Sequence, residues 1–234
     1  MNTIERLLGV CQRLVTHFKH STVATAALAD RQKRINMPVK KLLQDVSTRW
    51  NSTYYLLDRL VEMRWPISVV LSDERVTKRS DRNLDFRNEQ WDLAKELLGP
   101  LQQIEVATVY FSEENKVSTS SMLPILYGII DNLSVADGDS SIVKNFKESV
   151  VKSIKQRWSL DDISPILGLT TVLDARFKQL KFLSDTQKFY IMYALQSNIE
   201  RLVDDSDPDC ADCLISDQTH PLKVKRCWSL QIHK

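Results

Sequence analysis

Apolar residues recur at helical spacing along most of this chain of 234 residues. In the first segment they stand three and four positions apart, which is the spacing of one face of an amphipathic helix. These residues are Ile4, Leu7, Leu8, Cys11, Leu14, Val15 and Phe18. Alternation with a two-residue period is never sustained, and the Asn-Gly and Gly-Gly turns of β-hairpins are absent. The sequence therefore predicts an all-α fold, organised as a helical bundle.

Further helices are predicted over about residues 23–34, 50–64, 91–111, 123–133, 142–158, 166–177 and 184–203. The second helix is expected to end before Met37-Pro38, because a residue that precedes proline disfavours the α region. Pro66 is expected in the first turn of a new helix, or as a kink. Gly99-Pro100 predicts a kink or break in the long helix that contains it, and the charged stretch 73–88 is expected to be a surface loop.

Two regions follow from this pattern, a helical region over residues 1–203 and a tail over residues 204–234. The tail is acidic and loses the helical period, which is typical of a segment that is disordered in isolation. It holds Cys210, Cys213 and Cys227, which with His220 and His233 have the residue types of a zinc site. Their spacing is irregular and the aspartates around them keep the thiol pKa high. We therefore expect no metal site and no cofactor, and the few cysteines favour a reducing compartment.

The formal net charge is +2, from 32 basic and 30 acidic residues, but the charge is unevenly distributed. Residues 31–82 contain twelve basic and six acidic residues. Such an excess can face phosphate, although on solvated helices it is more often an ordinary soluble surface. No run of about 18 apolar residues occurs, so no membrane span is expected.

The segment from Asp45 to Tyr54, DVSTRWNSTY, is the densest group of functional side-chain types in the chain. Arg49 can pair with phosphate, Trp50 offers a face for base stacking, and Asn51 or Ser52 can bond a base edge or phosphate. A structural alternative is that Ser47 or Thr48 caps a helix whose Trp50 and Tyr54 fill the core. The residues by themselves favour this packing interpretation.

The stretch DVSTRWNSTYYLLDRLVE, residues 45–62, closely resembles the TRWNSTY segment of hAT-family transposases and of the zinc finger BED domain-containing proteins derived from them. Three further segments resemble the same family. Phe18–Ser21 is similar to its F-x-x-S segment, and Arg64–Ile67 is similar to the stretch after TRWNSTY. Thr171–Lys178 is similar to its L-D-P-R-F-K element, with Ala175 in place of proline. Their order and spacing cover about residues 1–200, which makes chance agreement improbable.

The resemblance implies a ribonuclease-H-like catalytic core interrupted by an all-helical insertion, to which residues 1–203 correspond. It places two catalytic aspartates upstream of Met1, and a glutamate and a C-terminal dimerisation segment beyond residue 203. The BED zinc finger is also missing. Metal-dependent strand cleavage needs those three carboxylates, so we expect no enzymatic activity and no catalytic residues here. Trp50 matches the tryptophan that the family implies in stacking on a base, which leaves DNA contact and packing evenly weighted.

Three functions are consistent with these observations. The first is a non-catalytic, nuclear, DNA-binding and transcription-regulator-like module that contacts DNA through Arg49, Trp50 and Asn51. The second is a scaffold whose exposed apolar seam binds a second copy or another protein. The third, an active transposase, requires carboxylates that the family resemblance places elsewhere. His17 with His20, and Asp161 with Asp162, are expected to be plain surface.

Overall fold

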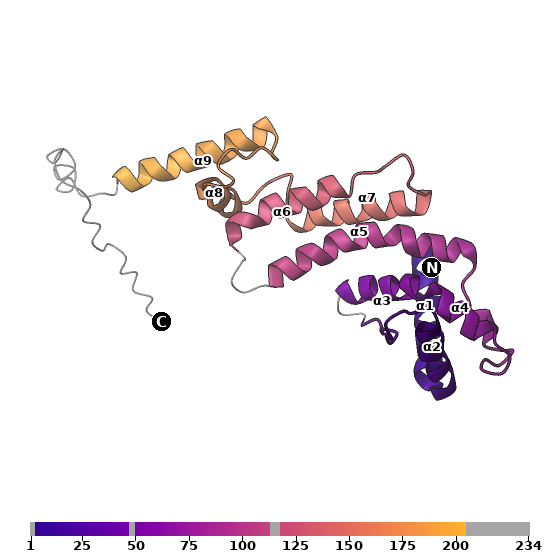
Figure 1. The fold of residues 1–234 in the computed structure, drawn as a ribbon. Helices are drawn as coiled ribbons and strands as arrows, with labels where there is room; N and C mark the ends of the chain where they lie inside the picture. Colours follow the sequence, from indigo (N-terminus) through magenta and orange to yellow (C-terminus); the bar gives the residue numbers. More distant parts are fainter. Residues whose placement is uncertain (1–2, 47–49, 113–117, 205–234) are drawn as a thin grey trace, which may run out of the picture. The chain divides into compact units, whose positions relative to one another are not determined.

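The computed structural model describes residues 3–46, 50–112 and 118–204, and for Trp50 and Asp204 it describes the backbone alone (Figure 1). All regular secondary structure in the described part is helical, with no strand, which confirms the predicted all-α class. The elements are α1 Thr3–His20, α2 Thr22–Arg34, α3 Trp50–Glu62, α4 Arg64–Ser72, the short 3-10 helix η1 Arg82–Leu84, α5 Asn88–Ser112, α6 Thr119–Asn132, α7 Ser141–Arg157, α8 Pro165–Leu173 and α9 Asp185–Asp204. None of these helices is both long enough and apolar enough to cross a bilayer.

The first helix is amphipathic as predicted, and its apolar face is buried. Leu7, Cys11, Leu14, Val15 and Phe18 are all buried in the main core. Burial also raises the pKa of the Cys11 thiol to about 12, because a thiolate loses its hydration in an apolar environment. Cys11 is therefore a packing residue in its neutral form.

The largest contact between two helices joins α3 to α5. The face that α3 buries carries Leu56, Leu57 and Leu60, each fully inaccessible to solvent. Burying a leucine side chain stabilises the fold by about 1.5–3 kcal/mol relative to leaving it exposed. This face therefore fixes the direction of α3, and with it the position of the first turn of that helix.

One sequence prediction about a helix limit was wrong, and the structure refines two others. α5 is continuous through Gly99-Pro100, where Pro100 removes one hydrogen bond but is itself buried in packing that holds the helix together. Phe86, in the supposed surface loop, is buried with its ring centroid 4.5 Å from that of Trp91. α8 ends at Leu173 and does not reach residue 177, because the chain turns at Asp174. Pro100 and Phe86 are placed by tertiary packing that no local pattern encodes.

The described residues divide into two units, the first ending at residue 184 and the second consisting of α9. Within the first unit, a pattern of neighbours occurs twice. Helix α1 contacts α2 and α3 while α2 contacts α4, and in the same way α5 contacts α6 and α7 while α6 contacts α8. The two sets of four helices are joined through α3 and α5.

Both sets end in the same Asp-x-Arg corner. Asp73 follows α4 and accepts hydrogen bonds from the backbone N–H and the guanidinium of Arg75. Asp174 follows α8 and accepts the same bonds from Arg176, as well as one from Ser120 Oγ at 2.7 Å. The Arg176 guanidinium holds the pKa of the Asp174 carboxyl well below its usual range, so this carboxylate stays charged and paired even in acidic solution.

Candidate nucleic-acid interface

The chain between α2 and α3 has no regular secondary structure, but side chains hold it in place. The Gln32 side chain is buried, and its amide Nε2 donates to the Lys40 carbonyl at 3.1 Å while its Oε1 accepts from the Lys40 N–H at 2.7 Å. Arg59 Nη1 of α3 donates to the Lys41 carbonyl at 2.8 Å. These bonds satisfy backbone groups that would otherwise lack partners in a non-helical segment.

Asp45 links the next part of this connection to the first turn of α3 by hydrogen bonds. Its carboxylate accepts hydrogen bonds from Ser52 Oγ at 2.5 Å and Thr53 Oγ1 at 3.2 Å. Ser52 Oγ also accepts from the Val46 N–H at 3.0 Å and lies 2.9 Å from the Val46 carbonyl. Three acidic or polar positions of the motif, Asp45, Ser52 and Thr53, therefore serve to anchor the backbone. Ser52, one of the candidate DNA ligands, is engaged in this network.

The three predicted DNA-binding residues follow this anchor directly. Arg49 lies outside the described residues, as do Ser47 and Thr48. Trp50 is the first residue of α3, so the sequence places it at a helix N-terminus, where backbone N–H groups and the helix dipole favour anions. Asn51 follows in the same turn and is half-buried, and its Oδ1 is buried without a hydrogen-bond partner among the described residues. DNA contact by these three residues stays a prediction.

Two tyrosines in the next turn were not singled out as a pair by the sequence pattern. The ring centroids of Tyr54 and Tyr55 are 5.4 Å apart. Tyr54 is half-buried, while Tyr55 is exposed and its hydroxyl donates to Glu105 of α5. This hydrogen bond raises the pKa of Tyr55. Because adjacent residues on a helix point in different directions, helical periodicity does not predict such a pair.

At least half of the basic residues between residues 31 and 82 take part in ion pairs. At least six of its twelve basic residues lie within 4.0 Å of a carboxylate, namely Arg31, Arg34, Lys40, Arg59, Arg75 and Arg82. Within the described part of the chain, Lys33, Lys41, Lys78 and Arg79 are exposed and have no acidic partner at that distance. The charge available to phosphate is therefore smaller than the sequence count indicates.

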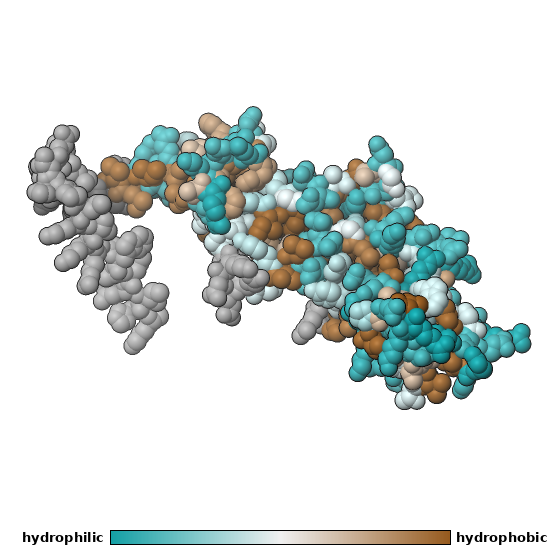
Figure 2. Space-filling model, in the orientation of Figure 1, coloured by the Kyte–Doolittle hydropathy of each residue, from teal (hydrophilic) through white to brown (hydrophobic). Residues whose placement is uncertain are grey.

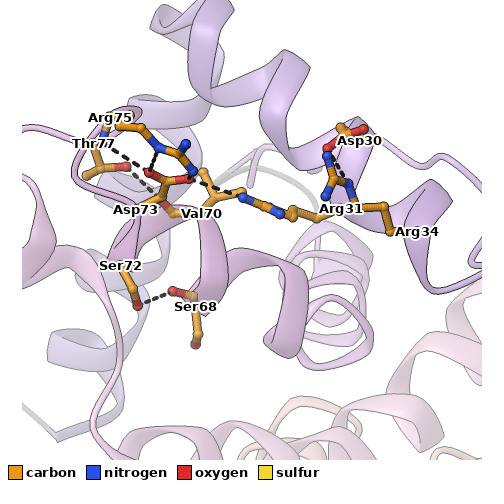
Figure 3. Close-up of polar contacts among 9 residues, drawn as sticks. All are labelled: Asp30, Arg31, Arg34, Ser68, Val70, Ser72, Asp73, Arg75 and Thr77. Atoms are coloured by element: carbon orange, nitrogen blue, oxygen red, sulfur yellow. Dashed lines mark hydrogen bonds and ion pairs between the residues drawn. The ribbon is translucent and has the colours of Figure 1, made fainter.

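Asp73 takes part in two of these ion pairs, with Arg31 and Arg75. Arg31 of α2 and Arg75 of the loop approach its carboxylate from different sides, with Arg31 Nη2 at 3.1 Å from Oδ2 (Figure 3). The hydrogen bonds from Arg75 lower the pKa of Asp73 to about 2, and the nearby Arg31 charge adds to this effect. The corner therefore links α2 to the end of α4 through a charged group.

Protonating Asp73 should weaken this link. A carboxyl whose pKa is lower in the folded state contributes stability that is present above its unfolded pKa and lost as the pH falls toward the folded value. We expect Asp73→Asn to lower the melting temperature above about pH 4, and the difference from wild type to shrink as the pH approaches 2. Thermal melts from pH 2 to pH 7 measure this, with Asp30→Asn, which alters an exposed pair with Arg34, as the control. A difference that does not depend on pH would contradict the assignment.

Metal-ligating side chains do not gather near this segment. His17 Nδ1 lies 3.6 Å from Asp81 Oδ2, and His17, His20, Lys78 and Asp81 line a common pocket. Across the described residues, no three His, Cys, Asp or Glu side chains lie close enough together to hold a metal ion. The cysteines Cys210, Cys213 and Cys227 lie outside the described residues.

Comparison with known proteins agrees with the motifs. Residues 1–99 match the family model described as the ZBED1 RNase-like helical domain. The chain is 21% identical over 187 residues to human zinc finger BED domain-containing protein 4, which covers 80% of this chain and 15% of that protein. It is 26% identical over 177 residues to human zinc finger BED domain-containing protein 6, covering 75% of this chain and 16% of that protein. No solved structure matches the chain.

Proposed function

This chain is a ZBED- and hAT-like protein with a transposase-derived helical domain, and from that premise we propose that it is a non-catalytic, nuclear module that binds DNA and serves transcriptional regulation. The chain spans 15% and 16% of the two human relatives, so this function is inferred for the helical part alone. The relatives are named for a zinc finger BED domain, and the helical domain would act beside such a finger.

The observation that carries the proposal is the anchoring of the Asp45–Tyr54 segment. Asp45 and Val46 are tied to Ser52, and Leu56, Leu57 and Leu60 hold the rest of α3 in the core. The chain between these anchors contains a guanidinium, an indole and an amide in consecutive positions, Arg49, Trp50 and Asn51. A helix N-terminus with these groups offers charge, a stacking face and hydrogen bonds to a single-stranded or distorted nucleic acid.

Trp50→Ala should separate stacking from packing. Loss of a stacked base weakens binding by about 1–3 kcal/mol, so we expect lower affinity for single-stranded and hairpin DNA with an unchanged melting temperature. Trp50→Phe keeps an aromatic face and should retain part of the affinity. Fluorescence anisotropy with labelled oligonucleotides measures the affinity, and Trp65→Ala, which removes an exposed tryptophan of α4, is the control. A lower melting temperature with unaltered affinity would show that Trp50 is a core residue.

Arg49→Ala tests the phosphate contact independently. It should weaken binding to every sequence to a similar degree, since a phosphate carries no sequence information. Lys155→Ala removes the same charge from the exposed face of α7 and is the matched control. Equal losses in the two variants would indicate a diffuse charge effect and would count against a site at α3.

A second candidate function is a scaffold for self-association. It is favoured by the surface of α9, where seven large apolar side chains are exposed within one helix. The other twelve exposed large apolar residues are scattered over residues 23–173, as is normal for a protein surface. Apolar patches of this kind on a soluble protein mark interaction sites.

A further inference from the structure

The first turns of α3 lie beside the C-terminal half of α5. The Tyr55 hydroxyl, in the second turn of α3, donates a hydrogen bond to Glu105 of α5. Arg64, which follows α3 closely, instead donates to Asn88 Oδ1 at the start of α5, at 3.0 Å. The two helices are therefore antiparallel (Figure 1). The surface next to the proposed DNA contact at the N-terminus of α3 is thus shared with α5.

Aromatic and apolar side chains are exposed on this shared surface. The Tyr55 side chain is exposed, and its ring centroid lies 5.4 Å from that of Tyr54, with an angle of 57° between the two rings. On α5, Val106 and Val109 are exposed as well, and Val109 lies one helical turn after Glu105. Figure 2 shows hydrophobic surface over this half of α5. An exposed ring beside apolar side chains suits a nucleobase, which can stack on it, better than a phosphate.

The carboxylates beside these two tyrosines bring negative charge to the surface. Asp58 is exposed four residues after Tyr54, and Glu105 approaches from α5. Burial raises the pKa of Tyr54, and the negative charges of Asp58 and Glu105 raise it further. A carboxylate repels a phosphate, but it accepts hydrogen bonds from the amino groups of bases. The charge of this surface therefore favours the bases of a strand over its backbone.

We propose that a base of single-stranded DNA stacks on the Tyr55 ring and that Glu105 accepts a hydrogen bond from the exocyclic amino group of this base. The inference rests on the proposed DNA binding and names the bases that the same site selects. Glu105 Oε1 accepts from the Tyr55 hydroxyl, which orients the carboxylate, and no other hydrogen bond reaches Glu105 from the described residues. Because the hydroxyl end of the ring contacts the carboxylate, a base on the ring places its edge beside Oε2.

Cytosine and thymine give the cleanest comparison for this selection. The two pyrimidines have rings of the same size, but cytosine presents the N4 amino donor where thymine presents the O4 acceptor. A carboxylate accepts from the first group and is repelled by the second. Oligonucleotides of equal length carry the same number of phosphates, and phosphate contacts carry no sequence information. A preference for cytosine therefore reports on the group that reads the base edge.

The full chain should bind oligo(dC) about ten-fold more tightly than oligo(dT) of the same length. Fluorescence anisotropy measures both affinities, at a slightly alkaline pH at which cytosine is not protonated. Glu105→Gln keeps the shape of the side chain, but its amide can donate as well as accept, so the ratio should fall to about one. Tyr55→Phe keeps the stacking ring and removes the hydroxyl that orients Glu105, so the ratio should fall to about three. Glu96→Gln removes the same charge from an exposed position of α5 and should leave the ratio unchanged.

The outcomes separate this inference from the proposed function. Equal affinities of the wild-type chain for the two oligonucleotides would overturn the selection by Glu105 and leave DNA binding intact. A preference for cytosine that survives Glu105→Gln, or that Glu96→Gln abolishes equally, would overturn it as well. Absence of binding to either oligonucleotide would overturn the proposed function together with this inference.

Discussion

Leu57→Ala is expected to lower the free energy of unfolding by about 2–5 kcal/mol. Leu57 is completely buried in the main core, on the face of α3 that packs in the large contact between α3 and α5. Removing its side chain loses apolar burial and leaves a cavity that neighbouring helices can only partly fill. Urea denaturation followed by circular dichroism gives the change directly.

The adjacent residue supplies the control. Asp58 is exposed on the same helix, and Asp58→Ala should change stability by no more than about 0.5 kcal/mol. Both variants alter helix propensity slightly in α3, so the difference between them isolates the buried contact. Similar effects for Leu57 and Asp58 would mean that α3 is not packed as the structure describes.

Gln32→Ala is expected to have the second largest effect, about 2–4 kcal/mol, because it leaves two polar groups near the core without their partners. The buried side chain of Gln32 bonds both the N–H and the carbonyl of Lys40. Its loss should also release the connection that leads to Asp45. We therefore expect faster tryptic cleavage after Lys40 and Lys41, in addition to the lower stability.

Gln12→Ala is the matched control for Gln32→Ala. Gln12 Nε2 also donates a hydrogen bond to the connection, to Asp45 Oδ2 at 3.3 Å, but this contact is exposed to solvent. Since water replaces an exposed hydrogen bond readily, this substitution should change stability by less than about 0.5 kcal/mol. Unchanged cleavage in the Gln32 variant would show that the connection is held by other contacts.

The sequence predicted the helices well because each helix that lines the core repeats its apolar residues every three or four positions. α1 and α2 begin and end within a residue of the predicted limits, and Ser21 caps α2 by accepting from the Ala24 N–H. The sequence was least informative at Pro100 and Phe86, for a common reason. Their places are decided by neighbours distant in sequence, such as the Trp91 ring beside Phe86, and local propensity is only a weak guide there.

The sequence singled out the motif of the candidate site but not the contacts that hold the segment in place. The motif identified Arg49, Trp50 and Asn51 as groups suited to DNA, and nothing in the described structure tests that role. No sequence pattern indicates that Asp45, Ser52 and Thr53 form one network, because hydrogen bonds across seven or eight residues depend on the path of the backbone. A count of charges also could not show that Asp73 forms an ion pair with Arg31, which is distant in sequence.

The most direct test of the proposed function is the salt dependence of DNA binding by the wild-type chain. Binding to a labelled hairpin oligonucleotide should weaken by about ten-fold or more between roughly 50 and 200 mM salt, as expected for contacts with about three phosphates. Arg49→Ala should reduce the slope of log affinity against log salt by about one phosphate contact. Absence of binding at the lowest salt, or an affinity that does not change with salt, would contradict the account.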